Sequence, residues 1–397
     1  MAARFWVGQS GGGNYNSTDW ALTTGGTTGQ ATPTSSDDVT FDGAGTFGNT
    51  ACTITATANA LTLTFTTGYT STITINATFT LIVAGNFTDR TNHTWTINST
   101  AAGALTISAA STITSNGKTF PGNVTFSNIN TKTISGNWTI TGTLTMGTAT
   151  GVINATTAET ISCAGLSSQV QSGTIGIILT GGTWSGTATS SCNLSGGLQF
   201  SGNVTISGSV NFSGGTVKYN SGSITTTGST WTCHTATTVD TNGMSWNNVI
   251  FDASVTYTIN SLLTINGTFT IGASAGPTFA GTAGWTCASL SSLQTAAAII
   301  TLKNGVTYTI TTSFTASGTR VGSILIFTSD DGTLKTILTL SNGASCNVIA
   351  NFTRVDASNG RAINTWNGTV TTCINVNSFT DALPPAQITG ARGAMSY

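Results

Sequence analysis

The sequence predicts an all-β protein, a single-stranded parallel β-helix (β-solenoid) with aromatic-capped ends. The first observation is an internal repeat: Gly117–Gly147 is written again as Gly243–Gly272, with Val124 matching Val249 at 249 − 124 = 125 residues. The second is that apolar residues alternate with Thr, Ser or Asn inside each copy, the period-two pattern of strands with one buried face. Because short-period solenoids use roughly 20 to 25 residues per turn, the repeat indicates about five or six turns.

Shorter repeats favour stacked turns over separate domains. Val306–Ile310 repeats Val255–Ile259 after 306 − 255 = 51 residues, which is not a simple fraction of the long repeat. Strand patterns recur throughout, as in solenoids that grow by adding turns. Leu290–Ile300 is the only stretch whose pattern also allows a short helix, although Ile299–Leu302 within and after it reads as a strand.

The composition limits the classes of partner. Charged residues are only 6% of the 397 residues, and the formal net charge is −1. Such a surface has no basic patch to attract nucleic acid or anionic lipid, and no apolar run approaches the roughly 18 residues of a membrane span. We therefore expect no nucleic-acid and no membrane partner. A weakly charged, strand-rich surface offers little repulsion between copies, which favours a homo-oligomer, a trimer first of all.

Cysteine and histidine usage predicts no metal, no disulfide framework and no cofactor. The seven cysteines are dispersed without a C-x-x-C pair, and His93 and His234 have no neighbour at ligand spacing. We expect buried free thiols and exposed or structural imidazoles. The opening Met1-Ala-Ala-Arg-Phe-Trp6 lacks the pattern of a secretory signal, so synthesis in a reducing cytoplasm is expected.

Three segments are expected: an N-terminal cap or attachment segment (1–42), the parallel β-helix (43–379) and an extended C-terminal tail (380–397). The first turn of a solenoid has no preceding turn over its core, so we predict that Trp6, Trp20 and Phe41 close it. Trp366 is predicted to cover the core at the other end.

The C-terminal tail is predicted to serve assembly. The strand pattern stops after Phe379, and the two prolines of Leu383-Pro-Pro385 cannot continue a hydrogen-bonded ladder. An extended peptide laid along a neighbour's surface or sheet edge would use the side chains Ile388, Arg392, Met395 and Tyr397. The alternative is a frayed end.

Both ends of the chain carry motifs that resemble a known family. The first has an aromatic and glycine-rich opening, Arg4–Gly8 with Gly11–Gly13, followed by Asp19-Trp20 and Asp37–Asp42. It resembles the opening of right-handed β-helix structural proteins of tailed bacteriophages and, more distantly, the first turns of bacterial surface passenger domains. Departures from the pattern are Gln9 after Gly8 and Tyr15 where a Trp is usual.

The second motif, Val355–Ser358 with Gly360 and Trp366, resembles the last turns of the same phage proteins. The resemblance implies a non-enzymatic virion protein, as a capsid decoration, head fibre, tail fibre or spike component. It also implies other virion proteins and host surface glycans as partners. The alternatives are a bacterial surface adhesin or extracellular filament subunit, on the bacterial cell surface, and a polysaccharide depolymerase.

The depolymerase alternative needs a pair of carboxylates about 5 to 10 Å apart. The chain has only 12 acidic residues, among them Asp330 and Asp331 in an Asp-Gly turn and Asp252, which could stack beside an acid one turn away. The densest polar cluster is Asp89-Arg90 beside His93. We expect solvated turn or surface groups at these positions and name no catalytic residue.

Overall fold

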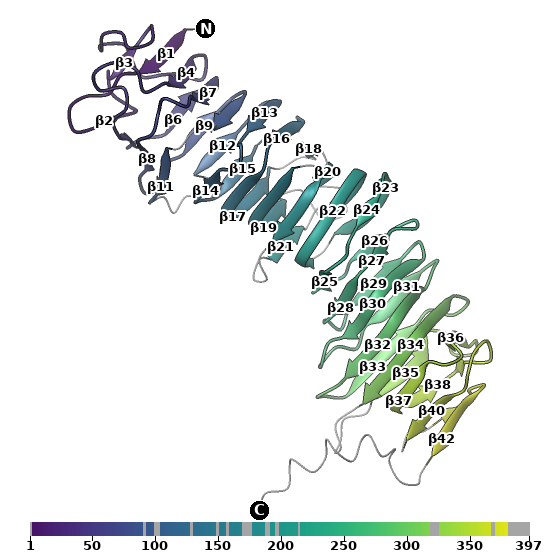
Figure 1. Ribbon diagram of the computed structural model, residues 1–397. Helices are drawn as coiled ribbons and strands as arrows, with labels where there is room; N and C mark the ends of the chain where they lie inside the picture. Colours follow the sequence, from purple (N-terminus) through teal and green to yellow (C-terminus); the bar gives the residue numbers. More distant parts are fainter. Residues whose placement is uncertain are drawn as a thin grey trace, which may run out of the picture. The chain divides into compact units, whose positions relative to one another are not determined.

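A computed structural model describes residues 2–89, 93–98, 104–127, 130–147, 151–155, 159–168, 177–186, 191–194, 198–212, 215–317, 325–366 and 370–379. The described chain is all-β, without a helix, and forms a parallel β-solenoid, which confirms the predicted fold class (Figure 1). It divides into two compact units, Met1–Ser229 and Thr230–Tyr397. Among these residues no helix is long and apolar enough to span a bilayer.

The strands of the first unit are β1 (Ala3–Trp6), β2 (Gly13–Asn14), β3 (Trp20–Ala21), β4 (Asp38–Phe41), β5 (Cys52–Ile54), β6 (Ala58–Ala60), β7 (Thr62–Phe65), β8 (Thr72–Ile75), β9 (Leu81–Val83), β10 (Phe87–Asp89), β11 (Thr94–Ile97), β12 (Leu105–Ile107), β13 (Ser111–Thr114), β14 (Thr119–Phe120), β15 (Val124–Phe126), β16 (Lys132–Ser135), β17 (Trp138–Met146), β18 (Gly151–Ala155), β19 (Thr160–Ser168), β20 (Ile177–Gly186), β21 (Ser191–Leu194), β22 (Leu198–Phe212), β23 (Thr216–Ser221) and β24 (Ile224–Thr225).

The second unit begins within β25 (Ser229–Cys233) and continues with β26 (Thr238–Asp240), β27 (Ser245–Trp246), β28 (Asn248–Phe251), β29 (Thr256–Ile259), β30 (Leu263–Ile271), β31 (Thr278–Gly281), β32 (Trp285–Leu293), β33 (Ala298–Leu302), β34 (Thr307–Ser317), β35 (Leu325–Ser329), β36 (Thr336–Leu340), β37 (Ser345–Ile349), β38 (Asn351–Thr353), β39 (Val355–Asp356), β40 (Ile363–Trp366), β41 (Val370–Thr371) and β42 (Val376–Phe379).

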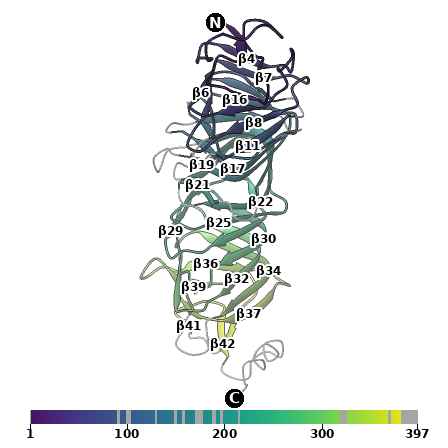
Figure 2. The ribbon, with the colours of Figure 1, turned by 90° about the vertical axis from the view of Figure 1, so that its left-hand side faces the viewer.

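In the first unit, successive turns stack in register (Figure 2). One inward column runs through β4, β7, β10, β13 and β16 and consists of the buried residues Val39, Leu63, Phe87, Ile113 and Ile134. The spacings are 63 − 39 = 24, 87 − 63 = 24, 113 − 87 = 26 and 134 − 113 = 21 residues, close to the expected turn length. This column is therefore a stack of apolar side chains, one from each strand, at the core of the unit.

Outward positions on the same strands carry threonine. A column of half-buried side chains consists of Thr40, Thr64, Thr88 and Thr114. Branching at Cβ suits the extended backbone, and the hydroxyl faces solvent without adding charge. The alternation of Thr with apolar residues thus divides each strand into an outer and an inner face.

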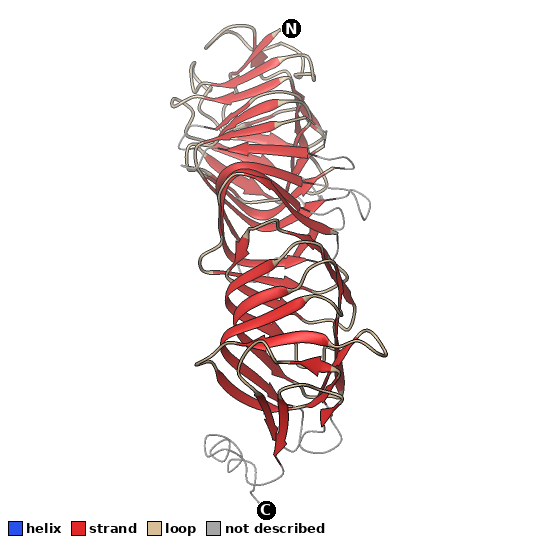
Figure 3. Cartoon of the chain, turned by 90° about the vertical axis from the view of Figure 1, so that its right-hand side faces the viewer, coloured by secondary structure: helices blue, strands red, loops and turns tan. Residues whose placement is uncertain are grey.

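In the second unit, long strands lie beside each other (Figure 3). The inward column from β28 to β37 consists of Val249, Phe269, Leu290, Phe314 and Cys346. Its turns lengthen from 269 − 249 = 20 to 346 − 314 = 32 residues. A register shift interrupts the β30–β32 pairing and another the β32–β34 pairing, as at β-bulges.

The helix considered for Leu290–Ile300 does not form. This stretch contains the end of β32 and the beginning of β33, joined by a short corner. Leu290 pairs in register with Phe269 on one side and Phe314 on the other, and its side chain is buried. Backbone pairing with two neighbouring turns outweighs the local helix propensity of the alanines.

Candidate functional site

The N-terminal aromatic residues form one buried cluster. Trp6 and Trp20 are 0% exposed, with ring centroids 5.2 Å apart in an edge-to-face arrangement. Phe41 lies 5.6 Å from Trp6 and stacks on Phe65 of the next turn at 4.9 Å. The Trp20 indole N–H donates to the backbone carbonyl of Tyr15 at 2.9 Å, so its polar atom is satisfied inside the cluster.

The first strand has a partner on each side. β4 pairs with β1 in parallel, whereas β3 pairs with it antiparallel, with Trp6 opposite Trp20. The β1–β3 ladder thus runs against the parallel β1–β4 ladder. A strand running against the solenoid direction suits a terminating element, because it does not continue the parallel stacking. That Trp6, Trp20 and Phe41 close the core remains our prediction.

The remaining predicted positions lie outside the described part. β40 ends at Trp366, whose backbone pairs with Phe379 of β42, but the Trp366 side chain is outside the description. The tail residues Ile388, Arg392, Met395 and Tyr397 lie in 380–397, also outside the described residues.

Asp89 and His93 form a buried pair, which corrects the expectation of a surface group. They are 1% and 2% exposed, and the His93 Nδ1 lies 3.5 Å from the Asp89 Oδ1. The Trp95 indole N–H donates to the other Asp89 oxygen at 2.9 Å. The His93 ring stacks on Phe65 at 4.2 Å, and the Lys118 ammonium donates to the His93 carbonyl at 2.6 Å.

Burial shifts the pKa values of both residues of this pair. It raises the pKa of Asp89 to about 6, against the lowering effects of the Trp95 hydrogen bond and the Lys118 charge. It lowers the pKa of His93 to about 3, with Lys118 adding to the effect. At neutral pH an ionised aspartate therefore faces a neutral imidazole. Both side chains are packed among aromatic rings inside the solenoid.

The second histidine also has a carboxylate partner. His234 follows β25 and Asp252 follows β28, and their Nδ1 and Oδ2 atoms lie 2.6 Å apart. Their side chains are 43% and 31% exposed. The sequence suggested an acid beside Asp252, whereas the structure places His234 there. Cys233 pairs with Phe251 at the ends of these strands. His234 and Asp252 are the next residues in the chain, so the pairing brings them together.

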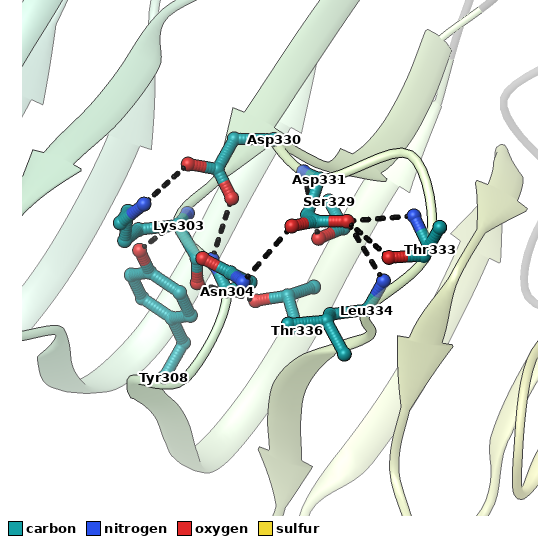
Figure 4. A network of polar contacts seen from close by, with 9 residues as sticks. All are labelled: Lys303, Asn304, Tyr308, Ser329, Asp330, Asp331, Thr333, Leu334 and Thr336. Carbon is teal, nitrogen blue, oxygen red and sulfur yellow. Dashed lines mark hydrogen bonds and ion pairs between the residues drawn. The ribbon is translucent and has the colours of Figure 1, made fainter.

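Asp330 and Asp331 belong to a polar network between two turns of the second unit (Figure 4). The Lys303 ammonium lies 2.9 Å from Asp330 Oδ2, and the Asn304 backbone N–H donates to Asp330 Oδ1 at 2.7 Å. Asp331 Oδ1 accepts from the Thr333 N–H and hydroxyl at 2.7 Å each and from the Leu334 N–H at 3.0 Å. Asp331 therefore shapes the turn that the sequence predicted, and Asp330 ties this turn to the preceding one.

The Asp331 carboxyl is unsuited to proton donation. Its hydrogen bonds from the Leu334 and Thr333 backbone lower its pKa to about 2. A general acid working near neutral pH needs a raised pKa instead. The network can brace neighbouring turns.

The described cysteines carry free thiols. Cys52, Cys163, Cys233 and Cys287 are buried, and Cys346 and Cys373 are half-buried. Burial raises the pKa of the Cys233 and Cys287 thiols, so both are protonated and inert at neutral pH. Within the described ranges no group of three or more His, Cys, Asp or Glu side chains could hold a metal ion.

No protein-family model, curated protein or solved structure matches this chain. The resemblance of the end motifs to tailed-phage proteins therefore stays a prediction from the sequence.

Proposed function

We propose that this chain is a non-enzymatic structural protein of a tailed-phage virion, a capsid decoration or head fibre, or a tail fibre or spike component. The observation that carries the proposal is the use of its carboxylates. All but Asp240 of the described aspartates accept a hydrogen bond or ion pair from their own chain, namely Asp19, Asp37, Asp38, Asp42, Asp89, Asp252, Asp330, Asp331 and Asp356. Carboxylates that hold turns and neighbouring strands together support a structural role over a depolymerase.

The chemistry of the exterior supports the same role. Columns of threonine hydroxyls continue from turn to turn, and charge is sparse. Copies of such a chain approach each other without strong repulsion, which favours a homo-oligomer that joins other virion proteins. Hydroxyl-rich, uncharged surfaces also suit hydrogen bonding to neutral host glycans, the further partner class that we propose.

Two measurements, one on purified phage particles and one on the purified chain, test the proposal. Antibody labelling of purified phage particles, with mass spectrometry of their proteins, should place the chain in the virion. Incubation of the purified chain with host surface polysaccharide should release no new reducing ends. Labelling of the bacterial surface instead of particles would favour the adhesin, and release of reducing ends would favour the depolymerase.

A further inference from the structure

The chain contains seven Asn-Gly dipeptides, a sequence that can modify itself. The glycine backbone nitrogen, once it loses its proton, attacks the asparagine Cγ, and no side chain on the glycine hinders the approach. A bond forms between Cγ and this nitrogen, the Cγ–Nδ2 bond breaks, and ammonia leaves a succinimide ring. Water then opens the ring to aspartate or isoaspartate. The net reaction exchanges an amide and water for a carboxylic acid and ammonia, without oxidant, reductant or enzyme.

The fold engages the glycine nitrogen in several of these pairs. In Asn116–Gly117 the glycine N–H donates to the Asn137 carbonyl at 2.7 Å, and in Asn266–Gly267 it donates to the Asn247 carbonyl at 2.8 Å. A donated hydrogen bond holds the nitrogen away from the asparagine side chain and must break before the attack. The glycine N–H of Asn359–Gly360 also donates, at 3.3 Å. These pairs are therefore protected by the backbone around them.

Asn342 and Gly343 are open to the reaction. They form the turn between β36 and β37, which the Ala344 N–H closes by donating to the Ser341 carbonyl at 3.1 Å. That bond joins the first and fourth residues of the turn, so it leaves out the N–H of the third, Gly343. Among the described residues none accepts a hydrogen bond from this N–H or holds the Asn342 side-chain amide. Both residues are exposed, and nothing lies within 4 Å of the Gly343 Cβ position.

Two other pairs have an open glycine but a more constrained asparagine. In Asn242–Gly243 the asparagine backbone N–H donates to the Ser261 hydroxyl at 2.7 Å. In Asn304–Gly305 the asparagine backbone N–H donates to Asp330 at 2.7 Å, and its side-chain amide lies 3.5 Å from an Asp331 oxygen. Asn342 is thus the asparagine with the fewest restraints among the Asn-Gly pairs that the structure describes.

We propose that Asn342 is a site of spontaneous deamidation, at which the folded chain gains a carboxylate. One conversion takes the formal net charge from −1 to −1 − 1 = −2, a large change for a surface with so few charges. β36 and β37 both pair with β34, so the strands on each side of the turn are held in place. Isoaspartate adds one carbon to the backbone, and the turn itself has to accommodate it. The inference goes beyond the proposed function and does not depend on it.

The test incubates the full chain at mildly alkaline pH, where the glycine nitrogen loses its proton more readily. Chymotryptic peptides are sequenced by mass spectrometry at intervals, because deamidation makes a peptide heavier by one mass unit. We expect Asn342 to be modified roughly ten times faster than Asn116 and Asn266, the factor that one intact hydrogen bond contributes. Isoelectric focusing should show a more acidic species accumulating in parallel.

Two controls separate the turn from the local sequence. Asn342→Gln should keep the melting temperature and lose most of the acidic species, because the longer side chain closes the ring far more slowly. In the chain unfolded by urea, Asn342, Asn116 and Asn266 should react at similar rates, since only the folded backbone distinguishes them.

An Asn342 that stays unmodified in the folded chain overturns the inference. Equal rates at Asn342, Asn116 and Asn266 in the folded chain also overturn it, as does a difference between them that persists in urea. An acidic species that Asn342→Gln does not reduce assigns the reaction to another residue and overturns it as well. None of these results changes with the presence or absence of the chain in virions, so the proposed function is tested separately.

Discussion

Gly267 lies directly against the side chain of Asn248 on the preceding turn. A Cβ added to Gly267 would be 2.3 Å from the Asn248 Oδ1, the oxygen that accepts the backbone N–H of Thr268 at 2.9 Å. Gly142 and Asn123 repeat this relationship at the same 2.3 Å, and 248 − 123 = 125 is the spacing of the sequence repeat. The asparagine side chain and a backbone carbonyl of the preceding turn, 2.8 Å from the added Cβ at Gly267 and 2.6 Å at Gly142, together explain the repeated glycine.

Gly267→Ala should lower the free energy of unfolding by about 1 to 3 kcal/mol, the usual cost of forcing atoms into an occupied space. Denaturant unfolding measures it. Combined with Asn248→Ala, the same substitution should cost less, because the nearer of the two oxygens it meets is gone, although the Asn247 carbonyl oxygen at 2.8 Å stays. Gly332→Ala is the control, since nothing lies within 4 Å of its Cβ position. Equal costs for Gly267→Ala with and without Asn248 would contradict the explanation.

Trp6→Ala should lower the free energy of unfolding by about 3 to 5 kcal/mol, because the ring is fully buried between Trp20 and Phe41. Leu22→Ala is the matched control from the same segment, with a side chain 51% exposed, and should change the stability by no more than about 0.5 kcal/mol. The cap prediction fails if Trp6→Ala unfolds at the same denaturant concentration as the unsubstituted chain.

Asp89 and His93 should make opposing contributions to the pH dependence of the free energy of unfolding. The folded pKa of His93, about 3, lies below its ordinary value of 6.5, so its contribution to stability is lost as the pH falls from about 6.5 to 3. The folded pKa of Asp89, about 6, lies above its ordinary value of 3.8, so the stability it contributes below pH 3.8 is lost as the pH rises to about 6. Between about pH 4 and 6 the two largely cancel.

Single substitutions should expose each dependence. His93→Phe keeps a ring on Phe65, and its stability relative to the unsubstituted chain should rise on acidification below pH 6.5, by at most about 1.4 kcal/mol per pH unit. The stability of Asp89→Asn relative to the unsubstituted chain should instead fall as the pH is lowered from about 6 to 4. Urea unfolding at pH 7, 5 and 4 decides this, and stability differences that do not vary with pH would refute it.

The fold should be independent of metal and disulfides, because the described cysteines are dispersed free thiols. Adding a chelator or a reductant should leave the melting temperature unchanged. Loss of a structural zinc or disulfide removes several kcal/mol. A decrease of more than about 10 °C with either reagent would therefore show that the prediction is wrong.

The sequence alone determined the fold class, because alternation of apolar residues with Thr, Ser or Asn sorts side chains to the two faces of a strand wherever that strand lies. The same alternation marked Phe87 and Asp89 as facing the same way, inward. The inward position of the Asp89 carboxylate could have predicted the buried pair. The polar residues around it in the sequence made a surface position the simpler interpretation.

Only the tertiary structure decided which residues meet across turns. Turn length varies from 20 residues between Val249 and Phe269 to 32 between Phe314 and Cys346, so no constant offset predicts the register. The pairing of His234 with Asp252 depends on that register. So does the strand structure around Leu290, because its hydrogen bonds go to strands in neighbouring turns and not to residues nearby in the chain.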